Sequence, residues 1–122
     1  MSTVKEIMGT QICPVGAILI DTGVNARVDG EVVAVFRLAG ETPDSPEEIY
    51  AIDGVDPFTQ VPVLSRGLVG SADGEPFVAS PLYKQRFSLK TGQCLDDESV
   101  RLKTYETSVV DGAVVVSSSQ AS

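Results

Sequence analysis

The sequence contains no histidine, and this absence removes a large part of enzyme chemistry. None of the 122 residues is His. Without an imidazole the chain can build no Ser-His-Asp triad, no Cys-His nucleophilic pair and no zinc site of the Cys/His kind. A general acid or base would need an Asp, Glu or Lys with a strongly shifted pKa. A binding or structural role is therefore favoured over catalysis.

Cysteine and basic residues are also scarce. Cys13 and Cys94 are too few for a disulfide framework, or for an iron–sulfur cluster held by this chain's thiolates alone. Lys and Arg total 9 against 17 Asp and Glu, which gives a net charge of −8. Phosphate backbones and anionic membrane surfaces both attract positive charge. We therefore expect no nucleic-acid partner and no membrane partner.

Long hydrophobic runs are missing as well. No apolar stretch approaches the roughly 20 residues that span a bilayer. Residues 1–10 lack the basic start and apolar core of a signal peptide. These features predict a cytoplasmic protein whose thiols are reduced.

The residues that are present predict one small all-β domain. Hydrophobic residues make up 43% of the chain, enough for a core at this length. Asp-Gly pairs at 29–30, 73–74 and 111–112 suit two-residue turns and predict three hairpins. Residues 31–38 (EVVAVFRL) are almost continuously apolar and predict a central strand. We expect a single domain over residues 1–122, with flexible ends at 1–8 and 118–122.

Two segments resemble the cluster-binding half of a Rieske domain. They are residues 53–58 (DGVDPF) and 80–95 (SPLYKQRFSLKTGQCL), so 53–95 corresponds to that half. Rieske domains hold a two-iron cluster with Cys-x-His on one loop and Cys-x-x-His on another. The strand and Thr-Gly turn that follow the second loop match at 87–94.

The ligand positions do not match that pattern. Asp56 and Phe58 stand where the first loop needs Cys and His, and Ser80 and Tyr83 where the second does. Because the chain has no His, nothing else supplies the two imidazoles. We predict that the four residues are vestigial ligand positions. The chain is expected to hold no cofactor and no metal.

Further motifs resemble the small subunit of assimilatory NADH-dependent nitrite reductase. They are Cys13-Pro14 and residues 56–58 (DPF), 63–67 (VLSRG), 78–87 (VASPLYKQRF) and 95–97 (LDD), in an order that spans about 11–116. The resemblance implies a Rieske-like, three-sheet antiparallel sandwich with little or no helix.

The same resemblance implies a function in nitrogen assimilation. The large subunit of that enzyme carries FAD, a 4Fe-4S cluster and sirohaem, and reduces nitrite to ammonium with NADH. The small subunit would be its accessory partner, with no catalytic residues of its own.

Five residues are candidates for contact with that partner. Phe58 and Tyr83 are predicted aromatic anchors, and Arg66, Lys84 and Arg86 are predicted charged contacts. Alternative roles are that Phe58 and Tyr83 fill the space left by the cluster, and that Lys84 and Arg86 only face water. For Arg66, anchoring of loop carbonyls is the preferred role.

Two other functions compete with this hypothesis. A Rieske-type ferredoxin would carry electrons, but the four replaced ligands count against it; cluster absorbance would favour it. A stand-alone binding sandwich or minor enzyme would show a deep polar pocket with a shifted carboxyl pKa.

Overall fold

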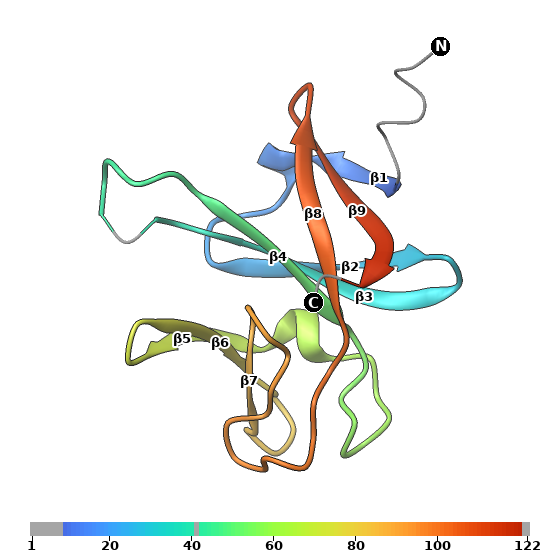
Figure 1. Cartoon of the computed structure of the whole chain (residues 1–122), viewed down its shortest axis with the longest axis vertical. Coiled ribbons are helices and arrows are strands. Elements are labelled where there is room, and N and C mark those ends of the chain that lie inside the picture. The colour runs from blue at the N-terminus through green and yellow to red at the C-terminus, as the bar shows by residue number, and fades with distance from the viewer. Residues whose placement is uncertain (1–8, 41, 121–122) are drawn as a thin grey trace.

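The regular structure in the described residues is almost entirely antiparallel β (Figure 1). The computed structural model describes residues 9–40 and 42–120. Within that part, no helix is long and apolar enough to cross a membrane. Two short 3-10 turns, η1 (Val15–Ala17) and η2 (Leu64–Arg66), interrupt the strands. The strands of the described part are β1 (Gly9–Pro14), β2 (Thr22–Val28), β3 (Glu31–Leu38), β4 (Glu48–Asp53), β5 (Leu68–Ala72), β6 (Glu75–Ala79), β7 (Arg86–Ser88), β8 (Thr104–Val110) and β9 (Ala113–Gln120).

All three predicted hairpins form at their Asp-Gly turns. They join β2 to β3, β5 to β6, and β8 to β9. In each turn the Asp has a φ of 52° and the Gly a φ between 80° and 83°. Positive φ at both central residues gives the turn a twist that matches the twist of the strands. The all-β prediction is confirmed.

Strand β3 is central, as its apolar run predicts. It pairs with β2 on one side and β4 on the other. Val33 and Val35 pack into one hydrophobic core, whereas Ala34, Phe36 and Leu38 pack into another. Because successive side chains of a strand point to opposite faces, a strand between two cores is apolar on both.

The strands form two hydrogen-bonded sheets, where the resemblance predicts three. One sheet has the order β1-β9-β8-β4-β3-β2 and the other β5-β6-β7. The larger sheet consists of two three-stranded units, and the register that joins them pairs Ala51 with Tyr105 and Ile52 with Thr104, between β4 and β8. The difference in sheet number therefore depends on two residue pairs, and the layout remains Rieske-like.

The two cores hold these units together. The first lies between the sheets and receives side chains from β3, β4, η2, β6 and β7. The second lies inside the bend of the six-stranded sheet. Residues 118–120, predicted to be flexible, continue β9, where Gln120 pairs with Tyr105. Residues 1–8 and 121–122, the other predicted flexible ends, lie outside the described residues.

Candidate functional site

The two loops that resemble the cluster loops are joined by a buried hydrogen bond. Asp56 lies between β4 and η2, and Ser80 follows β6; they are 0% and 1% exposed. The Ser80 hydroxyl donates to Asp56 Oδ2 at 2.5 Å. Asp56 Oδ1 accepts from the Phe58 amide at 2.8 Å, and Ser80 Oγ accepts from the Leu82 amide at 3.3 Å. Asp56 and Ser80 are the first predicted ligand positions of their loops, so this bond joins the two loops directly.

Each loop also closes on itself through its backbone. The Asp56 amide donates to the Val61 carbonyl at 2.8 Å. In the second loop the Ser80 amide donates to Gln85 O at 2.9 Å, and the Lys84 amide to Ser80 O at 3.0 Å. Lys84 has a φ of 66°, a left-handed conformation that closes this tight turn. These bonds fix the backbone from which Phe58 and Tyr83 project.

The two aromatic residues differ in their surroundings. The Phe58 ring lies 6.3 Å from the buried Phe87 ring, so part of it packs inward, although 38% of Phe58 is exposed. Tyr83 is 67% exposed and extends from the second loop into solvent. Phe58 therefore combines core packing with exposure, whereas Tyr83 is a surface side chain.

The three candidate cations also differ. The Arg86 guanidinium donates to Asp96 through Nε at 3.2 Å and Nη2 at 2.8 Å, and lies 5.7 Å from the centre of the Phe77 ring. Hydrogen bonds and charge from Arg86 lower the pKa of the Asp96 carboxyl. Arg86 is therefore engaged inside the chain, a role that the sequence did not indicate.

Arg66 and Lys84 are exposed and keep their charged groups in solvent. Within residues 9–40 and 42–120, neither side chain has a hydrogen-bond or ion-pair partner. The predicted bonds from Arg66 to loop carbonyls are absent from this part of the chain. Both cations are accordingly available to a partner.

The side chains at the four positions do not fit a Rieske cluster. Two thiolates and two imidazoles would be required, and the positions carry a carboxyl, a phenyl ring, a hydroxyl and a phenol. Asp56 and Ser80 bond to each other, and Cys94 and Cys13 pack against different cores. Nowhere in the described residues do three or more His, Cys, Asp or Glu side chains gather where they could hold a metal.

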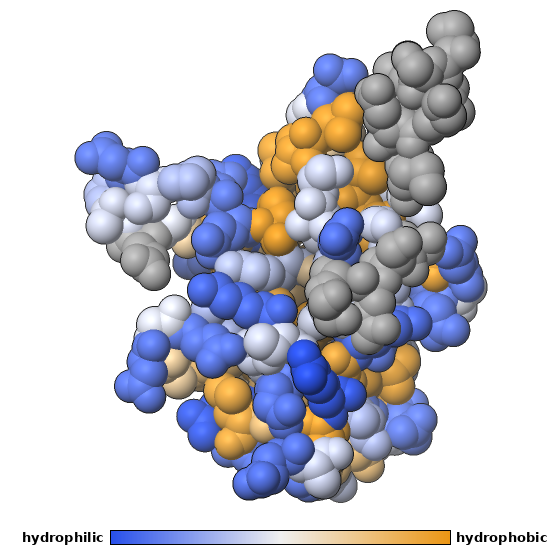
Figure 2. Space-filling model, in the orientation of Figure 1, coloured by the Kyte–Doolittle hydropathy of each residue, from blue (hydrophilic) through white to orange (hydrophobic). Residues whose placement is uncertain are grey.

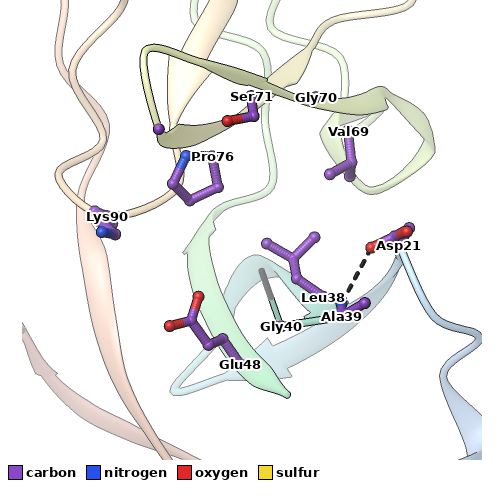
Figure 3. Close-up of a pocket in the computed structure, with 11 residues that line it drawn as sticks. Asp21, Leu38, Ala39, Gly40, Glu48, Val69, Gly70, Ser71, Pro76 and Lys90 are labelled. Atoms are coloured by element: carbon purple, nitrogen blue, oxygen red, sulfur yellow. Dashed lines mark hydrogen bonds between the residues drawn. The ribbon is translucent and has the colours of Figure 1, made fainter. Parts of the chain in front are cut away.

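A cleft that the sequence did not predict lies between the sheets, away from the two loops (Figure 3). Its volume is about 590 Å³. Val69 and Pro76 line the side formed by β5 and β6, and Glu48 lies on the opposite side. Lys90 and Asp21 lie at its two ends, where Asp21 Oδ1 accepts from the backbone amide of residue 39 at 3.2 Å.

The described surface carries apolar areas among its hydrophilic residues (Figure 2). On the visible face they gather over β8 and β9, and around the three-stranded sheet. The most exposed large hydrophobic residues are Leu68, Leu19 and Tyr83. The sequence indicated only Tyr83 of these three.

Comparison with known proteins decides the family. The model of the Rieske-like 2Fe-2S domain matches residues 10–117. The NADH nitrite reductase small subunit of Escherichia coli K12 is 47% identical over 103 residues, which cover 84% of this chain and 91% of that protein. The chain belongs to the family of NADH nitrite reductase small subunits. The resemblance stated from the motifs is confirmed.

Solved structures of the family share the fold. The NMR structure of an E. coli small subunit has a TM-score of 0.77 and 44% identity, and covers 88% of this chain and 94% of that one. The ferredoxin of carbazole 1,9a-dioxygenase from Nocardioides aromaticivorans has a TM-score of 0.73 at 18% identity, over 90% of this chain and 97% of that one. The ferredoxin match shows the Rieske fold alone.

One relative carries this family's sequence inside a larger protein. The NAD(P)H nitrite reductase large subunit of Klebsiella oxytoca is 38% identical over 109 residues. The match covers 89% of this chain but only 11% of that protein. A nitrite reductase small-subunit sequence and a large subunit can therefore occur in one polypeptide.

Proposed function

We propose that this chain is the non-catalytic small subunit of a cytoplasmic NADH-dependent nitrite reductase, which reduces nitrite to ammonium for nitrogen assimilation. The observation that carries the proposal is the 47% identity over 91% of the E. coli small subunit. Residues 1–122 act as one Rieske-like domain. The large subunit, with its FAD, 4Fe-4S cluster and sirohaem, performs the chemistry.

The partner of this chain is that large subunit. The Klebsiella oxytoca relative supports this, because it holds a small-subunit sequence and a large subunit in one polypeptide. Two parts that are joined in one protein commonly associate when they are separate chains. The chain brings no redox group of its own to the complex. The side chains at positions 56, 58, 80 and 83 support this, since neither a thiolate nor an imidazole is among them.

Iron binding tests the cofactor-free part of the proposal. We expect the purified chain, incubated anaerobically with ferrous iron and sulfide, to keep no iron after desalting and to show no visible absorbance. The reason is the donor chemistry, because a Rieske centre needs two Cys and two His. A ferredoxin of the same fold serves as the positive control. A stable two-iron spectrum from this chain would contradict the proposal.

The docking surface is formed by the two joined loops. Phe58 and Tyr83 supply aromatic contact area, and aromatic side chains dominate many interface hot spots. The unpaired charge of Lys84 lies in the second loop, and that of Arg66 lies in η2, which follows the first loop; both favour a negatively charged rim on the partner. Arg86 belongs to the support of the loops rather than to the contact, because Asp96 already engages it.

Replacing Phe58 and Tyr83 together by Ala is expected to weaken binding to the large subunit by about tenfold or more. The two rings lose their contact area, while the Asp56–Ser80 bond between the loops remains. The measurement is co-elution of the two subunits, with titration of nitrite-dependent NADH oxidation by the small subunit. Val109→Ala removes a half-exposed side chain from β8 and should change neither result. Equal affinity for the double variant and the wild type would refute the docking surface.

A further inference from the structure

One edge of the three-stranded sheet is open. In the β5–β6 hairpin the residues next to the two-residue turn, Ala72 and Glu75, form a hydrogen-bonded pair. Because such pairs alternate along an antiparallel ladder, Gly70 also bonds to β6, whereas Val69 and Ser71 turn their amides and carbonyls away from it. Pro76 opposite Ser71 agrees with this alternation, since its carbonyl accepts from Leu89 on the β7 side.

The opposite edge of that sheet is closed. Along β7 the Ser88 amide donates to Gln93 O at 2.9 Å, and the Leu95 amide donates to Arg86 O at 2.7 Å. Residues 93–95 thus cover the outer side of β7. Within the described residues, no segment covers the outer side of β5 in this way.

Strand β5 also lacks the features that protect sheet edges. Edge strands are commonly guarded by charges, prolines or bulges. The edge strand β1 has a bulge between Gln11 and Cys13 and ends at Pro14. The edge strand β2 presents the exposed polar residues Asn25 and Arg27. In contrast, β5 reads LVGSA, with no charge, no proline and no register shift.

The surroundings of this edge combine apolar and acidic groups. Leu68, at the start of β5, is 78% exposed, and Leu19 is 72% exposed. The turn that holds Leu19 lies near β5, because Asp21 and Val69 line the same cleft (Figure 3). Asp73, in the hairpin turn, adds a second carboxyl at the far end of β5. The edge strand is thus uncharged along its length, with Asp73 beyond its far end, while Asp21 and the exposed Arg66 both lie near its start.

We propose that the open edge of β5 receives an extended segment of the large subunit as a fourth strand of the sheet, and that this segment carries Lys or Arg at the end that lies beside Asp73. Exposed strand edges bind peptides in this way, with affinity from backbone hydrogen bonds and specificity from side chains. The inference rests on the proposed function and adds a second contact to the docking surface.

A second copy of this chain is the weaker candidate for the same edge. The chain has a net charge of −8, so two copies would bring like charges together. A Lys or Arg of the large subunit instead meets Asp73 with the opposite charge.

Residue-resolved hydrogen exchange of the amides tests the proposal. In the free chain the Val69 and Ser71 amides should exchange rapidly, and those of Gly70 and Ala72 slowly, because only the second pair bonds to β6. In the complex with the large subunit, the Val69 and Ser71 amides should slow by about tenfold or more. Gly70 and Ala72 serve as the internal control.

The outcomes separate this inference from the proposed function. If the subunits form a complex but Val69 and Ser71 exchange as in the free chain, the edge contact is wrong and the proposed function stands. If no complex forms, both fail. If the two amides are already protected in the free chain at high concentration and not at low concentration, a second copy occupies the edge and the inference is overturned.

A proline variant gives an independent measurement. Ser71→Pro removes an amide that faces away from β6, and the preceding Gly70 has no side chain to clash with the ring. We expect this variant to fold, with the Gly70 amide still protected, and to bind the large subunit about tenfold or more weakly. Ser71→Ala, which keeps the amide, should bind like the wild type. Unchanged affinity of a folded Ser71→Pro chain would refute the strand addition.

Discussion

Replacing Ser80 by Ala is expected to lower the free energy of unfolding by about 2–3 kcal/mol. The substitution removes the hydroxyl that donates to Asp56 Oδ2 and leaves that oxygen buried without its partner. Leaving one buried polar group unpaired costs more than removing both partners. A domain of this size has a total stability of about 5–15 kcal/mol, so the loss is a substantial fraction.

A double-mutant cycle isolates the Asp56–Ser80 bond. Asp56→Ala removes the same bond and also the acceptor of the Phe58 amide, so this single variant should be the less stable of the two. In the Asp56→Ala background, Ser80→Ala should cost only about 0.5 kcal/mol or less, because the Asp56 acceptor is already gone and only the long 3.3 Å bond from the Leu82 amide to Ser80 Oγ is lost. Denaturant unfolding followed by circular dichroism measures each corner of the cycle.

The control for this cycle is an exposed serine bond. Ser99 donates to Asp97 at 2.6 Å in an exposed loop, so Ser99→Ala should change stability by less than about 0.5 kcal/mol. Equal losses for Ser80→Ala and Ser99→Ala would show that the bond between the loops is not a structural link. Additive costs in the cycle would lead to the same conclusion.

Local rules predict the hairpins of this fold well. The three Asp-Gly turns fix strand pairing because their positive φ values select one register. The apolar run 31–38 predicts β3 because a strand with so many consecutive apolar residues must be buried on both faces. Both features depend on residues that lie next to each other in the chain.

The features that the sequence did not predict depend on distant partners. Strand β1 has no turn signal and forms because β9 is available to pair with it. Arg86 looks like a free cation until the fold brings Asp96 to 2.8 Å. The sequence does not predict the open edge of β5. The turn predicts that β5 pairs with β6, but it does not predict whether another strand pairs with the other side of β5.

The two loops that resemble the cluster loops of a Rieske domain are held together by contacts between their own side chains. In a Rieske domain the cluster itself crosslinks the loops through its ligands. Here a buried hydrogen bond joins Asp56 to Ser80, and the Phe58 ring packs toward Phe87. The contacts within the polypeptide therefore support the backbone arrangement of the two loops.

Replacing Phe87 by Ala is expected to have the largest effect on stability, about 3–5 kcal/mol. The side chain is completely buried in the core between the two sheets, and its ring also supports Phe58. Truncation removes apolar contacts and leaves a cavity that the surrounding strands can fill only in part. Because this core joins β7 to β3 and β4, the substitution weakens the packing between the two sheets.

Phe77→Ala is the matched control for this prediction. Phe77 lies on the neighbouring strand β6, is half-buried, and packs on the opposite face against Gly70 and below Arg86. Its loss should cost only about 1–2 kcal/mol, since water already reaches part of the ring. Denaturant unfolding compares the two variants under the same conditions. If Phe77→Ala were as destabilising as Phe87→Ala, the stability of this unit would not depend on the core between the sheets, and the loops that carry Phe58 and Tyr83 would need another support.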